Sequence, residues 1–294
     1  MKRIKNLIRN CNYLSKHSLW DQREEDIVYL TNKILDDVRY EYDLKNQLIS
    51  VPSILNSKES LDLIIKSGKS FVRTGDGECK IIMGLDQPFQ SYEEDLAEGL
   101  KKILRAENKN LLVGINRNYY IPGILNNYEP FYRRHAYDYR QVYKKYMDDN
   151  EVYIDATCTA YRFENLNEKE TKEQFEAWRN AFDNKRIVIV SGEGVLEKLD
   201  FDIFELAKDK KYIYGPARNA WAAREIITKQ IEETVDKDQL IVFILGMAGK
   251  VMISELVEKG YTCWDVGHLA KYYDYYCKRV DGGEQLIKDF YAPD

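Results

Sequence analysis

Seven short apolar stretches alternate with helical patterns along this sequence, and this alternation limits the possible folds more than any other feature. The stretches are 70–73 (SFVR), 111–115 (LLVGI), 151–154 (EVYI), 186–190 (RIVIV), 211–214 (KYIY), 240–245 (LIVFIL) and 261–266 (YTCWDV). Helical patterns separate them, notably over 168–182, 218–231 and 250–259. Strands that alternate with helices predict a mostly parallel sheet covered on both faces. The sequence therefore predicts a Rossmann-like, doubly wound α/β fold.

Two helix starts carry a recognisable signal. Asn56 and Glu59 have the spacing of a capping box, in which each side chain accepts a hydrogen bond from the other residue's backbone N–H. Ser91 and Glu94 have the same spacing ahead of an apolar helical pattern. We expect a helix to begin at each of these pairs.

The N-terminal region differs from the rest of the chain. Residues 1–20 hold basic residues and no acid, with apolar residues roughly on one helical face. A basic amphipathic helix here could touch an anionic membrane surface, and a frayed terminus is the alternative. We expect a helical extension over residues 1–56 and one domain over residues 57–294.

Composition excludes several protein classes. The chain has 44 Lys and Arg against 49 Asp and Glu, a net charge of −5, so nothing indicates nucleic-acid binding. Five scattered cysteines without a Cys-x-x-Cys pair argue for a reducing compartment, and we expect a cytoplasmic protein. The 23 tyrosines cluster around 119–147 and 272–276. They are consistent with helix surfaces and a homo-oligomer interface, or with a wall that binds sugars.

Polar and glycine-rich segments follow most of the predicted strands. They include TGDGE after residue 73, SGEG after 190, GPARNAW after 214 and GMAGK after 245. Ligands of such sheets bind beyond the carboxyl ends of the strands, and glycines let the backbone approach a phosphate. The segments lack the third glycine of a dinucleotide fingerprint, the full P-loop pattern and a Gly-x-Ser-x-Gly elbow. A dehydrogenase, a P-loop NTPase and a serine hydrolase are all disfavoured.

Asp76 and Glu78 alternate with Gly75 and Gly77 directly after the first strand. In an extended segment, residues two apart point to the same side, so both carboxylates could meet one divalent cation. Mg²⁺ or Mn²⁺ takes one or two carboxylates and completes its shell with water and substrate phosphates. An acidic turn that pairs with a basic neighbour such as Arg73 is the alternative.

The order of several segments resembles that of the GT-D-type glycosyltransferases, a family first catalogued as a bacterial domain of unknown function. The segments are FVRTGDGECKIIMG, IVIVSGEGVL, IYGPARNAW and LGMAGKVMISELVEKGYTCWDVGHL, over roughly residue 57 to the C-terminus. The resemblance implies transfer of a hexose, glucose or galactose, from a UDP-sugar to a protein- or lipid-linked glycan acceptor. It also implies Mn²⁺ (or Mg²⁺) as cofactor and a role in surface polysaccharide or glycoprotein assembly.

The same resemblance implies roles for particular residues. Asp76 and Glu78 match the metal motif and Arg73 supports it. It implies that Glu193, Arg218 and Asn219 contact the nucleotide sugar and that Asp265 and His268 form the polar pair at the last strand's exit. The glycine-rich strand exits, with Gly75, Gly77, Gly192 and Gly246, would hold the nucleotide diphosphate. Lys250 departs from a loop that usually holds small residues, and either adds phosphate affinity or is solvated.

The reaction and its base stay open at this point. An inverting transferase needs a base for the acceptor's proton, and Glu193, Asp265 and His268 are the candidates. A nucleotide-sugar hydrolase is the alternative enzyme. A binding protein without activity, built on a transferase scaffold, is the alternative outside enzymes.

Overall fold

The computed structural model describes residues 51–120, 130–160 and 168–279, with scattered positions between 27 and 48. The chain divides into two compact units, of which the larger comprises Pro52–Ile121 and Asp138–Asp294. The smaller comprises Met1–Val51 and Pro122–Tyr137. Residues 1–20, where a basic amphipathic helix and a frayed terminus are the alternatives, lie outside the described residues, and the boundary at residue 56 stays a prediction.

The larger unit is built on a seven-stranded parallel sheet. Its strands are β1 (Ser70–Thr74), β2 (Leu111–Ile115), β3 (Ile154–Asp155), β4 (Arg186–Gly192), β5 (Asp209–Gly215), β6 (Leu240–Ile244) and β7 (Thr262–Asp265). Their order is β3-β2-β1-β7-β6-β4-β5, and every pair is parallel. Each of the seven predicted stretches contributes a strand, so the predicted α/β fold is confirmed.

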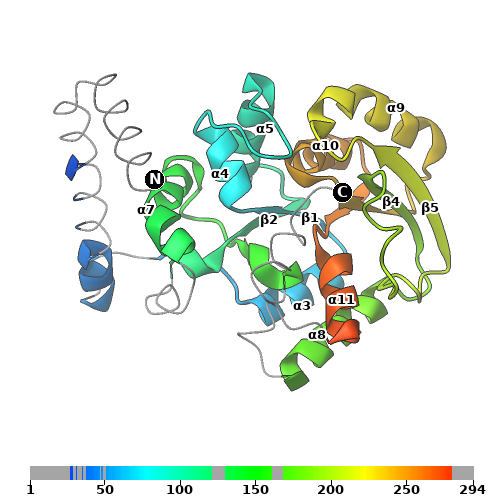
Figure 1. Ribbon diagram of the computed structural model, residues 1–294, viewed down its shortest axis with the longest axis horizontal. Coiled ribbons are helices and arrows are strands. Elements are labelled where there is room, and N and C mark those ends of the chain that lie inside the picture. The colour runs from blue at the N-terminus through cyan, green and yellow to red at the C-terminus, as the bar shows by residue number, and fades with distance from the viewer. Residues whose placement is uncertain are drawn as a thin grey trace, which may run out of the picture. The chain divides into compact units, whose positions relative to one another are not determined.

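Helices cover both faces of this sheet (Figure 1). One face carries α4 (Asp76–Ile82), α5 (Glu94–Leu104), α9 (Arg224–Thr234) and α10 (Gly246–Glu258). The other carries α3 (Ser57–Ser67), α8 (Glu168–Phe182) and α11 (Leu269–Lys278). The remaining helices are α7 (Pro130–Tyr146) and the 3-10 turns η1 (Arg117–Tyr119), η2 (Ala156–Thr159) and η3 (Ala220–Ala223). The predicted helix over 218–231 begins later, at Arg224, because η3 precedes it.

Only one of the two predicted capping boxes forms. Asn56 Oδ1 accepts the Glu59 N–H and Glu59 Oε2 accepts the Asn56 N–H, each at 2.9 Å, and α3 follows. The box at Ser91 is wrong, because α5 begins at Glu94 without a side-chain cap. The Ser91 N–H instead donates to the Asn219 side chain at 2.9 Å. A contact with a distant loop has replaced the local one.

Aromatic side chains fill the interior. Phe71, Trp178, Phe182 and Trp264 pack together on the face covered by α8. Three of the clustered tyrosines are also at most 1% exposed, namely Tyr119, Tyr139 and Tyr143. These tyrosines belong to the core of the unit, so they do not form an oligomer interface. The predicted oligomer stays a prediction without their support.

Four cysteines in the described residues are free, namely Cys79, Cys158, Cys263 and Cys277. Among the helices that the structure describes, none combines the length and the apolar character required to cross a membrane.

Candidate functional site

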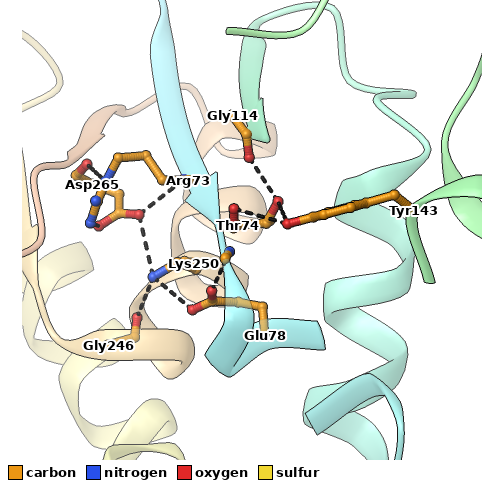
Figure 2. Close-up of polar contacts among 9 residues, drawn as sticks. Arg73, Thr74, Glu78, Gly114, Tyr143, Gly246, Lys250 and Asp265 are labelled. Carbon is orange, nitrogen blue, oxygen red and sulfur yellow. Dashed lines mark hydrogen bonds and ion pairs between the residues drawn. The ribbon is translucent and has the colours of Figure 1, made fainter. Parts of the chain in front are cut away.

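The exits of β1, β7 and β6 lie side by side, because these strands are neighbours in the sheet and run parallel. Their exits carry Gly75, Val266 and Leu245, each followed by polar or glycine residues. Four charged side chains meet beneath this edge, from β1, α4, α10 and β7 (Figure 2). We refer to Arg73, Glu78, Lys250 and Asp265 as the charge network.

The turn after β1 is helical rather than extended. Asp76 is the first residue of α4, and Gly75 precedes it as the N-cap. The premise that Asp76 and Glu78 share one side of an extended segment is therefore wrong, since residues two apart diverge on a helix. The Asp76 side chain is 41% exposed and pairs with Lys80 at 3.2 Å. Glu78 is 8% exposed, and its Oε2 accepts the Gly75 N–H at 2.7 Å.

Arg73 is bound to Asp265 through both backbone and side chain. The Arg73 N–H and Nη2 donate to the two Asp265 carboxylate oxygens at 3.0 and 3.1 Å, and Nε donates to the Asp265 carbonyl at 3.0 Å. Burial acts to raise the pKa of Asp265, but the cations of Arg73 and Lys250 outweigh it and hold this pKa below its ordinary value. Asp265 is therefore an ionised partner of Arg73, which disfavours it as a base.

Lys250 lies between the two carboxylates of the network. Its Nζ is 3.1 Å from Glu78 Oε1, 3.4 Å from Asp265 Oδ2 and 3.3 Å from the Gly246 carbonyl. The residue is 5% exposed. Lys250 is therefore not a solvated lysine, because its ammonium is buried among the oxygens of Glu78, Asp265 and Gly246.

Gly267 was not among the predicted site residues, although the structure shows a strict requirement for it. Its φ is +50°, and an added Cβ would lie 1.8 Å from Arg73 Nη2. Only glycine leaves room for the guanidinium at this point of the β7–α11 turn. The glycine in DVGH was the available signal, but the sequence does not show that a distant arginine packs on it.

His268 follows as the N-cap of α11 and is partly buried. Burial, together with the cations of Lys271, Arg73 and Lys250, lowers the pKa of His268 to about 3. The imidazole is therefore neutral near pH 7 and holds a transferred proton weakly. This argues against His268 as the acceptor's base, and the choice of base stays a prediction.

His268 is expected to make the protein less stable as the pH is lowered. Its pKa is lower in the folded protein than in the unfolded chain, so below about pH 6.5 the unfolded chain binds more protons. The free energy of unfolding should therefore decrease as the pH is lowered from about 6.5 to 4. His268 contributes at most about 1.4 kcal/mol per pH unit to this decrease. Urea titrations of the protein and of His268→Gln at several pH values measure it. Identical slopes in the two proteins would contradict the assignment.

The other predicted residues lie at the exits of β4 and β5, which are separated from β1 and β7 by β6 in the sheet. Glu193 and Arg218 are exposed. Gly192 packs against the loop that follows β5, because a Cβ on Gly192 would lie 2.9 Å from Ala217 Cα. The Asn219 N–H donates to the Phe89 carbonyl at 2.7 Å. The structure thus brings Arg73, Glu78 and Asp265 together but separates them from Glu193, Arg218 and Asn219.

A second set of contacts joins η3 and the start of α9 to the first turn of α5. The Trp221 indole N–H donates to Asp95 Oδ1 at 2.9 Å. Arg224 pairs with Asp95 Oδ2 at 3.1 Å and lies over the Trp221 ring at 4.3 Å. Sequence reasoning missed these residues, because nothing along the chain relates residue 95 to residues 221 and 224.

The remaining glycines of the site have local roles. A Cβ on Gly77 would lie 2.9 Å from Met247 Cε, so Gly77 lets the start of α4 approach the start of α10. Gly246 is the first residue of α10 and has a φ of +58°. Its carbonyl accepts a hydrogen bond from the Lys250 ammonium. Whether Gly75, Gly77, Gly192 or Gly246 contacts a nucleotide stays a prediction.

Of the two predicted metal ligands, Asp76 has the more accessible carboxylate, and metal binding itself stays a prediction. Within the described ranges, no group of three or more His, Cys, Asp or Glu side chains is arranged to hold a metal. Both Glu78 oxygens are engaged, one by the Gly75 N–H and one by Lys250. Asp76 is the accessible carboxylate, and one carboxylate with substrate phosphates satisfies Mg²⁺ or Mn²⁺. Of the two predicted ligands, the geometry favours Asp76 as the direct one.

A parallel α/β sheet with charged groups beyond the carboxyl ends of its strands defines a class of proteins that bind ligands at that edge. A sequence model of the glycosyltransferase GT-D fold matches residues 71–292. The chain belongs to the GT-D glycosyltransferase fold family.

Curated relatives come from streptococci. A probable glycosyl transferase Gly of Streptococcus gordonii is 28% identical over 233 residues, which cover 76% of this chain and 33% of that protein. Glycosyltransferase GlyD of Streptococcus pneumoniae serotype 4 is 26% identical over 236 residues, which cover 79% of this chain and 29% of that protein. The chain thus spans about a third of the length of these relatives.

Solved structures share the fold. A domain of unknown function 1792, described as having a distinct glycosyltransferase fold, superposes with a TM-score of 0.72 at 25% identity. The match covers 83% of this chain and 91% of that one. A protein of the same domain from Streptococcus sanguinis, described as a new glycosyltransferase, gives a TM-score of 0.72 at 24% identity, over 79% of this chain and 87% of that one. The latter likeness concerns the fold alone.

Proposed function

We propose that this chain is a metal-dependent glycosyltransferase that moves a hexose from a UDP-sugar to a protein- or lipid-linked glycan acceptor. Its membership of the GT-D family supports the reaction class. The observation that carries the proposal is the charge network under the exits of β1, β6 and β7, with the exposed Asp76 carboxylate beside it. UDP as the nucleotide, glucose or galactose as the sugar and Mn²⁺ as the ion come from the family resemblance.

The donor's diphosphate would meet a favourable electrostatic environment at this edge. The N-terminus of α10, which no side chain caps, presents backbone N–H groups and the positive end of the helix dipole. Arg73 and Lys250 lie beneath the same edge, where Asp265 and Glu78 balance their charges, so the favourable contribution comes from the helix. When bound, the cation would neutralise charge that develops on the diphosphate leaving group. Asp76 would hold it, while Glu78 fixes the Gly75 N–H and thereby the turn that presents Asp76.

Calorimetric titration of UDP, UDP-glucose and UDP-galactose, each with Mn²⁺ and with EDTA, tests this proposal. We expect binding that requires the metal. Asp76→Asn should weaken the metal-dependent binding by at least about tenfold, because loss of even an indirect partner of a metal has that effect.

Asp62→Asn is the matched control for this substitution. Asp62 pairs with Lys66 four residues later in α3, as Asp76 pairs with Lys80 in α4, but it lies away from the strand exits. Binding of the three nucleotides should be unchanged in this variant. Failure of every uridine nucleotide to bind, with or without metal, would overturn the proposed function.

A further inference from the structure

Lys250 has the surroundings of a bound cation rather than those of an ordinary lysine. Its ammonium has three N–H donors, and three oxygens surround it, from Glu78, Asp265 and Gly246, at 3.1, 3.4 and 3.3 Å (Figure 2). Its side chain is 6% exposed, and those of Glu78 and Asp265 are 10% and 5% exposed. All three charged groups are therefore largely removed from water.

The charges of the network balance only when Lys250 is counted. Arg73 and Lys250 contribute two positive charges, while Glu78 and Asp265 contribute two negative charges. Arg73 contacts Asp265 and leaves Glu78 to Lys250. A buried carboxylate is costly unless it is paired, so a cation is required between Glu78 and Asp265.

We infer that Lys250 takes the place of a metal ion between Glu78 and Asp265, and is a positioning residue that holds Glu78 in its capping position below Asp76. Its ammonium keeps Glu78 directed at the Gly75 N–H, and thereby sets the start of α4. A divalent cation is then left with Asp76 as its protein ligand and depends on the donor's phosphates. The inference rests on the proposed function only for the choice of Mn²⁺ as the probe.

Two substitutions at Lys250 separate charge from space. Lys250→Ala removes the ammonium and empties the space that two carboxylates face. Lys250→Met removes the same charge but fills most of that space. Oxygen ligands of this type suit Mn²⁺, so the alanine variant should acquire a site and the methionine variant should not. Lys259→Ala is the control on the same helix, because the Lys259 side chain is 49% exposed and pairs with Glu232.

The measurements are Mn²⁺ titration calorimetry and the Mn²⁺-dependent shift of Tm, both without nucleotide. We expect Mn²⁺ to bind Lys250→Ala about tenfold or more tightly than it binds the unaltered protein, Lys250→Met or Lys259→Ala, and to raise the Tm of the alanine variant alone. An alanine variant that folds only when Mn²⁺ is added gives the same support, since the ion then replaces the ammonium.

Three results would overturn the inference. These are equal Mn²⁺ affinity of the alanine and methionine variants, tight Mn²⁺ binding by the unaltered protein without nucleotide, and an alanine variant that stays unfolded with Mn²⁺. UDP titration of the unaltered protein is a separate result. If it fails while Lys250→Ala acquires Mn²⁺, the proposed function is wrong and the role of Lys250 stands.

Discussion

Replacing Gly267 with alanine is expected to abolish nucleotide binding and to destabilise the protein by about 4 kcal/mol or more. The new Cβ would lie 1.8 Å from Arg73 Nη2 and 2.7 Å from its Cζ, at a residue whose φ is +50°. The guanidinium is the end of a side chain, but two hydrogen bonds to Asp265, from Nε and Nη2, hold it in place. If the guanidinium moves, the buried Asp265 carboxylate keeps Lys250 as its cationic partner but loses Arg73.

Gly260→Ala is the matched control. Gly260 also has a positive φ, +84°, but a Cβ there meets nothing within 4 Å. Its substitution should therefore cost only the strain of a left-handed conformation, about 1–2 kcal/mol. Urea denaturation and UDP titration of both variants measure the difference. Equal losses of stability in the two variants would show that contact with Arg73 is not what requires Gly267.

Arg73→Met is expected to destabilise the protein by about 3–5 kcal/mol, because it removes one partner of a buried ion pair. The side chains of Arg73 and Asp265 are 15% and 5% exposed. Burial acts to lower the pKa of Arg73, but Asp265 outweighs it and holds this pKa above its ordinary value. The same pairing keeps the pKa of Asp265 low, so its contribution to stability is present at neutral pH and is lost as pH falls below the ordinary aspartate range.

A double-mutant cycle with Asp265→Asn checks this coupling. The double variant should lose less stability than the sum of the single losses, because it leaves no unpaired charge at this position of the network. The gap between the unaltered protein and Arg73→Met should narrow below about pH 4, where the carboxylate takes a proton. Additive losses, or a gap that does not change with pH, would contradict a coupled pair.

Both predictions concern residues that bind no substrate in the proposed mechanism. Arg73 and Gly267 act by fixing Asp265 and, through Lys250, Glu78. The catalytic geometry at Asp76 would then depend on a network drawn from β1, α4, α10 and β7. Preorganised groups of this kind matter because small displacements of reacting groups are costly.

The sequence by itself determined the class of fold. The central strands β4 and β6 form because the runs 186–190 and 240–245 can be buried on both faces, a property of the residues that does not depend on their partners. The helix start at Asn56 was likewise local, since both halves of its capping box lie within four residues. Features of this kind depend on residues close together in the sequence, and they form in the folded protein unless a tertiary contact replaces the local one.

Only the tertiary structure decided how the site is built. The side chains of Asp76 and Glu78 diverge because α4 begins at Asp76. The Ser91 N–H donates to Asn219 Oδ1 and so takes no part in a capping box. Lys250 lies 172 residues from Glu78 along the chain, and Gly267 lies 194 residues from Arg73. Both are required because of which strand exits become neighbours. Strand order is a property of the whole sheet. The sequence therefore identified the edge where the chemistry would lie, while the packing of β1 against β7 set which charges meet there.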